Sequence, residues 1–214
     1  MPIYNKDGQI IYSPFGVDGN QLGHAYDING NIVYSSGPVN VKVMNYNVGN
    51  WYIGSGTNVP SNKKTEYDAL QRGILADNAC NICVFEEYWN NFCADGTTAV
   101  SILDDYYSSI DVIGGTTQYG GRCISMNYPL LESSNFAFSQ QGVQGNTLVN
   151  KISINGHDVY IIGTHLQWNS VATQKLQVQE LLEYLLDKEY FILCGDFNNY
   201  TVTPSEDRTS ELYI

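Results

Sequence analysis

The stretch "YFILCGDFNNY", residues 190–200, decides the fold that we expect for this chain. An apolar run ends abruptly in Gly-Asp-Phe-Asn-Asn, so a strand with a buried pattern ends in side chains that carry oxygen ligands. Polar groups gathered where strands leave a sheet are how α/β enzymes build their sites. The stretch therefore raises the question of which other strands end in the same way.

Three further apolar strands are expected to end in a side chain that can bind a metal ion or a phosphate oxygen. "VMNYN" ends at Asn47, "CVFEE" at Glu87 and "IIGTH" at His165, while "ILCGDFN" supplies Asp196 and Asn198. Each one alone has an ordinary structural explanation, such as a turn, a solvated strand end or a core histidine. Four such ends in one chain favour a shared site.

Amphipathic helices and a hairpin separate these strands. "KKTEYDALQRGILADNA" and "SVATQKLQVQELLEYLLDK" each predict a helix with one apolar face, formed by Tyr67, Leu70, Ile74 and Leu75 in the first and by Val178, Leu181, Leu182 and Leu185 in the second. "NTLVNKISINGHDVYIIGTHLQW" predicts a hairpin around Asn155-Gly156. Strands interleaved with helices, together with hairpins, predict a mixed-sheet α/β fold rather than a purely parallel one.

The N-terminal segment repeats a pattern of its own. "YNKDGQIIYSP" (4–14) and "YDINGNIVYSS" (26–36) each carry an Asp-Gly or Asn-Gly step followed by a short β-branched run. These steps favour tight hairpin turns, so each unit is predicted to be a small hairpin. We expect a hairpin repeat appendage over residues 1–38 and a main domain over residues 39–214.

The composition limits the classes of function. The 214 residues suffice for one substantial core with a small appendage. Ten basic residues against 22 acidic ones give a net charge of −12, which disfavours an extended basic groove for nucleic acid. A nuclease whose bound metal ion supplies the positive charge stays open. Five cysteines without a regular framework favour free thiols and a reducing compartment.

Nothing in the sequence predicts a membrane anchor. No run approaches the roughly 18 consecutive apolar residues of a membrane span, and "MPIYNKDGQI" has neither the basic nor the apolar region of an ordinary secretion signal. We expect a soluble protein, cytoplasmic or associated with a particle, although the sequence does not indicate the compartment. An export signal of another kind, or one already removed, stays open.

The four strand ends, in this order, resemble the endonuclease/exonuclease/phosphatase superfamily, which has the DNase I-like fold. The resemblance covers roughly residues 40–200. The family's motifs are a strand ending in Asn, a strand ending in Gln-Glu, Thr-His-Leu and Gly-Asp-Phe-Asn. They are matched at Asn47, at Glu86 and Glu87 with Glu86 in the Gln place, at His165, and at Asp196 and Asn198. The resemblance implies a DNase I-like α/β sandwich with mixed sheets.

The resemblance also implies a phosphoester hydrolase, of phosphodiesterase or nuclease type, that uses Mg²⁺ or Mn²⁺. Glu87, assisted by Asn47, would hold the cation, because hard cations prefer oxygen ligands. Asp196 would orient and help activate the attacking water. Asn198 and His165 would donate hydrogen bonds to the phosphate as negative charge builds in the transition state.

The substrate is a phosphodiester whose class the sequence leaves open. Arg122, in "GGRCISMNY", is a candidate phosphate contact because a guanidinium matches phosphate geometry, with a surface salt bridge as the alternative. "GTHLQW" and the helix after it are most similar to neutral sphingomyelinase-like members of the family. The acidic balance decides little between nucleic acid and a lipid or small-molecule phosphodiester.

The sequence departs from the family after "GDFN". Family members continue through further strands to a late Asp-His pair whose histidine serves in acid–base catalysis. Here no such pair follows, and the other two of the three histidines, His24 and His157, lie in the repeat region and beside the hairpin turn. We therefore expect a sandwich that lacks its last strands and has weak or no activity alone.

Three explanations for this departure stay open. The chain is a fragment of a longer enzyme, or a second chain completes the sheet and supplies the histidine, or the fold was kept for binding after catalysis was lost. The alternative function is accordingly that of a non-catalytic binding or assembly protein, in which the hairpin repeats serve association.

Overall fold

The computed structural model describes residues 3–4, 10–12, 24–26, 32–35, 40–49, 61–88, 93, 95–114, 121–140 and 146–198. Its N-terminal compact unit contains two short antiparallel pairs, β1 (Ile3–Tyr4) with β2 (Ile10–Tyr12) and β3 (His24–Tyr26) with β4 (Ile32–Ser35). The turns of both expected hairpins lie outside the described residues. The domain boundary after residue 38 stays a prediction.

Within the described residues, the second compact unit contains two mixed four-stranded sheets. One has the order β5-β6-β8-β7 and consists of β5 (Val43–Asn47), β6 (Ile82–Glu86), β7 (Ser109–Ile113) and β8 (Arg122–Met126). The other has the order β12-β11-β10-β9 and consists of β9 (Glu132–Ala137), β10 (Asn146–Ile154), β11 (His157–His165) and β12 (Phe191–Asp196). The predicted mixed-sheet α/β fold is therefore confirmed.

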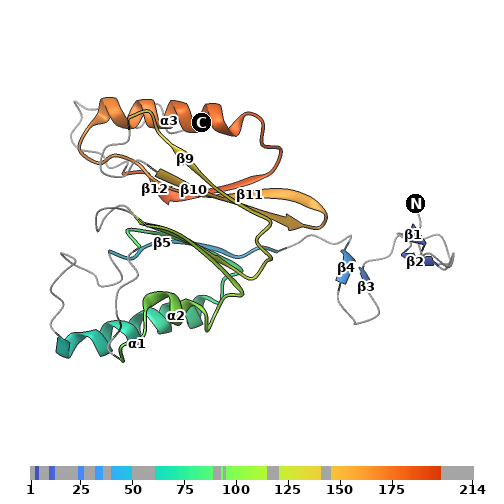
Figure 1. The fold of residues 1–214 in the computed structure, drawn as a ribbon, viewed down its shortest axis with the longest axis horizontal. Coiled ribbons are helices and arrows are strands. Elements are labelled where there is room, and N and C mark those ends of the chain that lie inside the picture. Colours follow the sequence, from blue (N-terminus) through green and yellow to red (C-terminus); the bar gives the residue numbers. More distant parts are fainter. Residues whose placement is uncertain are drawn as a thin grey trace. The chain divides into compact units, whose positions relative to one another are not determined.

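Helices cover the outer face of each sheet, so the layers run helix, sheet, sheet, helix (Figure 1). The helix α3 (Val171–Leu185) lies on the β9–β12 sheet, while α1 (Ser61–Asn78) and α2 (Ala99–Leu103) lie on the other. Between the sheets, Gly163 lies close to side chains of the facing sheet, and an added Cβ would stand 2.8 Å from the Val84 side chain. Glycine at this position of β11 lets the two sheets pack face to face.

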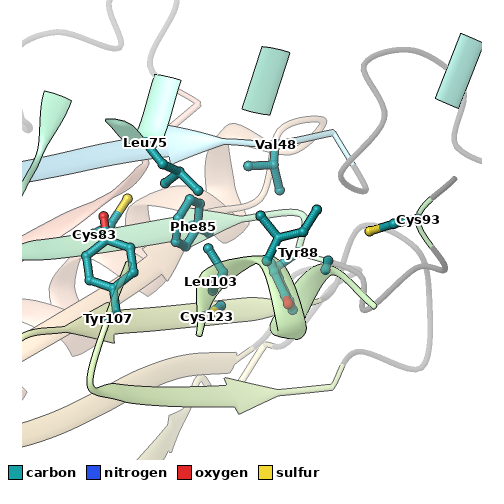
Figure 2. Close-up of a cluster of buried hydrophobic side chains, with 11 residues drawn as sticks. Val48, Leu75, Cys83, Phe85, Tyr88, Cys93, Leu103, Tyr107 and Cys123 are labelled. Atoms are coloured by element: carbon teal, nitrogen blue, oxygen red, sulfur yellow. The ribbon is translucent and has the colours of Figure 1, made fainter. Parts of the chain in front are cut away.

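Two apolar clusters hold the helices onto the sheets. Figure 2 shows the cluster under α1 and α2, in which buried aromatic, aliphatic and cysteine side chains pack together: Val48, Leu75, Cys83, Phe85, Tyr88, Cys93, Ala99, Ile102, Leu103, Tyr107 and Cys123. The cluster under α3 consists of Phe138, Val149, Ile162, Leu166, Leu181 and Leu185. Removing these side chains from water is the main favourable contribution to folding. All five cysteines are free.

The buried faces of the two long helices differ from the predicted apolar faces. Leu70 of α1 is 46% exposed and Leu182 of α3 is 40% exposed, so the prediction was wrong at both positions. Buried glutamines take their place: Gln71 in α1, and Gln174 and Gln177 in α3. Amide side chains are tolerated inside because they are hydrogen-bonded, as Gln71 is to Tyr46.

Strand β12 forms one edge of its sheet among the described strands. That further strands, from a longer chain or from a second chain, complete this sheet stays a prediction. No helix in the part of the chain that the structure describes is long and apolar enough to cross a membrane.

Candidate functional site

Two pairs of parallel strands bring the polar strand ends together. Asn47 stands opposite Glu86 at the end of the β5–β6 pair, and His165 stands opposite Asp196 at the end of the β11–β12 pair. Parallel strands present their carboxyl ends at one edge of a sheet. Because β12 also lies against β5 and β6 of the facing sheet, the polar ends of both sheets meet.

The Asn47 side chain joins carboxylates from the two sheets. Its Nδ2 donates hydrogen bonds to Glu87 Oε1 at 3.2 Å and to Asp196 Oδ2 at 3.0 Å. Its Oδ1 accepts a hydrogen bond from the Gly49 N–H at 3.0 Å, which fixes the orientation of the amide. Residues far apart in the sequence thus form one polar cluster.

Two site residues have a backbone conformation that non-glycine residues rarely adopt. Glu87 has a φ of 51° and Asn198 a φ of 50°, both in the left-handed region. At Glu87 this turns the chain as it leaves β6, so that its carboxylate meets Asn47 while the preceding Glu86 stays buried. Strained conformations of this kind cluster at functional sites because the surroundings must hold them in place.

The turn after β12 is held by its own side chains. The Asn198 N–H donates to Asp196 Oδ1 at 2.9 Å, and Asn198 Nδ2 donates to the Leu166 carbonyl oxygen at 2.8 Å. The Asn198 amide thereby links this turn to the segment that follows His165. A hydrogen bond from Asn198 to a phosphate stays a prediction.

Two glutamines of α3, which sequence reasoning missed, support the site from behind. Gln174 Nε2 donates to the Phe197 and Asn198 carbonyl oxygens at 2.7 and 3.1 Å. Gln177 Oε1 accepts from the buried Gln167 N–H at 2.8 Å. Their signal in the sequence is their spacing, which places them on the same helical face as Leu181 and Leu185.

His165 is 2% exposed, and its Nε2 lies 3.8 Å from Asp196 Oδ2, a separation longer than a hydrogen bond. Burial lowers the pKa of His165 to about 4, with the positive charge of Arg122 acting in the same direction and Asp196 opposing it. The imidazole is therefore neutral at neutral pH, and one ring nitrogen carries a hydrogen that it can donate. Its Nδ1 has no hydrogen-bond partner among the described residues.

Burial also perturbs the two consecutive glutamates. It raises the pKa of Glu87, and the Asn47 hydrogen bond partly opposes this rise. It raises the pKa of the fully buried Glu86 to about 8, against the opposing attraction of Arg122. Asp196 repels both carboxylates and raises both pKa values further.

Arg122 does not lie on the surface, where a salt bridge was the alternative to a phosphate contact. Its side chain is completely buried, and it donates to the Gly121 carbonyl oxygen at 2.9 Å and to the His165 carbonyl oxygen at 3.3 Å. Burial lowers the pKa of Arg122 to about 10, and the nearby carboxylates oppose the shift. A phosphate contact at Arg122 stays a prediction.

The donor set fits a hard cation that keeps part of its water shell. Asn47 lies within hydrogen-bond distance of two carboxylates, Glu87 and Asp196. Mg²⁺ is usually held by one or two carboxylates and keeps several waters. No group of three His, Cys, Asp or Glu side chains among the described residues could hold a metal ion by itself.

Comparison with known proteins identifies solved structures of similar fold. No family model and no curated protein matches the chain. Truncated TDP2 from Caenorhabditis elegans matches with a TM-score of 0.57 and 17% identity, over 75% of this chain and 63% of that chain. A hairpin-deletion mutant of beta toxin from Staphylococcus aureus matches with a TM-score of 0.58 and 20% identity, over 78% and 70% of the two chains.

Sphingomyelinase C from Streptomyces griseocarneus matches with a TM-score of 0.58 and 18% identity, over 77% of this chain and 66% of that chain. These proteins share the DNase I-like fold, so the predicted fold class is confirmed. The chain spans less than two thirds of the TDP2 and sphingomyelinase C structures. At these identities the likeness shows the fold alone.

Proposed function

We propose that this protein is a phosphodiester hydrolase that uses Mg²⁺ or Mn²⁺. The observation that carries the proposal is the contact of Asn47 with both Glu87 and Asp196, beside the buried His165. The resemblance of these four strand ends to the endonuclease/exonuclease/phosphatase superfamily supports the same chemistry. A bound cation would polarise a phosphoryl oxygen and offset charge on the leaving group.

Each side chain has one role in the proposed reaction. Glu87 and Asn47 hold the cation, and Asp196 orients and helps to activate the attacking water. The neutral imidazole of His165 and the Asn198 amide donate hydrogen bonds to the phosphate. Such donors are each worth a few kcal/mol when they are aimed at charge that develops in the transition state.

The proposed substrate class, a phosphodiester, is inferred from the chemical groups of the site and not from the shape of a pocket. A nucleic acid and a lipid phosphodiester present the same reacting group. TDP2 and sphingomyelinase C share the fold. The motif "GTHLQW" resembles the sphingomyelinase-like members and so favours a lipid phosphodiester. We propose a phosphodiester substrate and leave its remaining groups to experiment.

The test is hydrolysis of bis-p-nitrophenyl phosphate with and without Mg²⁺. We expect weak, metal-dependent activity that falls by at least about 100-fold in Glu87→Gln and in Asp196→Asn, because each change removes a charged group from the reacting centre. Cation binding, measured by calorimetry, should weaken in Glu87→Gln. This second measurement separates a lost ligand from a lost catalytic group.

Matched controls are Glu189→Gln and Asp77→Asn, which change the same functional groups at exposed positions. Both should keep wild-type activity and cation affinity. Activity that survives both site substitutions would overturn the site assignment. A protein with neither activity nor cation affinity at Glu87 would favour the alternative of a binding or assembly protein.

A further inference from the structure

Arg122 lies beside the site but has no role in the proposed reaction. Its guanidinium is completely buried, although burying a cation is costly unless it is paired and hydrogen-bonded. In the antiparallel β6–β8 register it stands directly opposite Glu86, which is also completely buried. The buried guanidinium therefore needs hydrogen bonds and nearby negative charge that offset the cost of removing it from water.

The hydrogen bonds of Arg122 connect both halves of the site. The Gly121 carbonyl oxygen accepts from Arg122 Nη1 at 2.9 Å and also from the N–H of Tyr88, the residue after Glu87, at 3.1 Å. Arg122 Nη2 donates to the His165 carbonyl oxygen of the facing sheet at 3.3 Å. One guanidinium thus links the turn that carries Glu87 to the strand end that carries His165.

Three acidic side chains act electrostatically on the same guanidinium. Glu86, Glu87 and Asp196 all stabilise its positive charge, with Glu86 contributing most. Neither carboxylate oxygen of Glu86 has a hydrogen-bond partner within the described residues. These acidic side chains repel one another when they are ionised, and the positive charge of Arg122 offsets that repulsion.

We propose that Arg122 is a positioning residue and the internal counter-ion of this site. It fixes the backbone at His165 and keeps the three acidic side chains together before a divalent cation binds. The inference rests on the proposed function for its effect on hydrolysis, whereas its effect on folding does not depend on that function. A resident positive charge also repels an incoming cation, so the two compete for the same carboxylates.

The test compares wild type with Arg122→Met, Arg122→Lys and the double variant Glu86→Gln/Arg122→Met. In EDTA, Arg122→Met should unfold at a lower urea concentration because the buried Glu86 carboxyl loses the cation that faces it, and the double variant should recover part of the loss because that carboxyl is removed as well. Calorimetry should show that Arg122→Met binds Mn²⁺ about tenfold more tightly, because repulsion is removed. If Arg122 were an ordinary core residue, its substitution would lower both the stability in urea and the Mn²⁺ affinity.

The hydrolysis assay separates the charge from the hydrogen bonds. Arg122→Met should lower kcat about tenfold with little change in KM, because His165 loses its backbone support. Arg122→Lys should keep the wild-type Mn²⁺ affinity but lower kcat, because one ammonium group cannot reproduce the planar fork that reaches both carbonyl oxygens. Equal or weaker Mn²⁺ binding by Arg122→Met would overturn the inference.

Other outcomes also decide the matter. If Arg122→Met does not fold, the double variant is compared with Glu86→Gln, from which it differs only by the loss of Arg122. Mn²⁺ binding by the double variant that is no tighter than by Glu86→Gln contradicts the inference. If wild type neither binds Mn²⁺ nor hydrolyses the substrate, the proposed function fails separately. In that case the urea midpoint still tests the counter-ion role of Arg122. A midpoint of the double variant above that of Arg122→Met supports this role, and a midpoint no higher overturns it.

Discussion

At the scale of single residues, the site depends on backbone conformations that its side chains hold in place. Glu87 and Asn198 share a positive φ with Ala79 and with Asn155 of the β10–β11 turn. Asn155 has a positive φ because it lies in a tight hairpin turn, a position where asparagine is common. Asn198 has in addition a side chain that bonds to Leu166 next to His165.

Asn198→Ala tests this difference. Alanine at a φ near +50° costs roughly 1–2 kcal/mol of stability, and the lost hydrogen bond to the Leu166 carbonyl oxygen adds about 1 kcal/mol. Asn155→Ala carries the same backbone cost at a φ of 51°. We expect both variants to be destabilised in urea, but only Asn198→Ala to lose hydrolysis beyond its loss of folded protein. Equal activity in the two variants would contradict the role of Asn198.

At the scale of elements, parallel strand pairing explains why the polar strand ends lie together, and buried side-chain amides explain why the predicted helix faces were partly wrong. The strand ends at Asn47, Glu87, His165 and Asp196 were recognisable because each follows an apolar run, and parallel pairs bring such ends to one edge. Their catalytic roles stay predictions. Strand β9 is exposed at almost every position and polar over its first four residues, so it lacks the alternating hydrophobic pattern by which a strand could be predicted.

The helix α3 shows why hydrophobicity alone misplaced a buried face. Leu182 was assigned to that face, yet Gln174 and Gln177 are buried, because each makes hydrogen bonds to backbone groups of loops at the site. A hydrophobic scale counts an amide as polar, although its burial is tolerated once its hydrogen bonds are made. The burial of Glu86 and Arg122 escaped prediction for a related reason, since each depends on partners in other strands.

Gln177→Leu measures the contribution of one such amide. The substitution keeps the helix but leaves the Gln167 N–H without its acceptor, so we expect a loss of about 1–3 kcal/mol in the free energy of unfolding. Gln179→Leu on the exposed face of the same helix is the control and should change stability by less than about 0.5 kcal/mol. A neutral Gln177→Leu would show that the cluster under α3 accepts leucine in place of the amide.

At the scale of the whole molecule, the buried thiols couple stability to alkaline pH. Cys83 and Cys123 lie in the cluster under α1 and α2 (Figure 2). Burial raises the pKa of Cys83 well above its usual value and that of Cys123 to about 12. Unfolded thiols release their protons near the ordinary value of 9.0, whereas the folded protein retains them to higher pH.

The sign of the effect follows from proton linkage. Above pH 9 the folded state binds more protons than the unfolded state, so stability that is fully present below pH 9 is lost as pH rises towards 12. Each fully buried thiol should contribute a loss of about 1 kcal/mol per pH unit in this window. Urea unfolding at pH 8, 9.5 and 10.5 measures the slope, and Cys123→Ala should reduce it at a small cost in stability at pH 8. An unchanged slope in that variant would mean that Cys123 ionises freely in the folded protein, and that the sheet under α1 and α2 admits water.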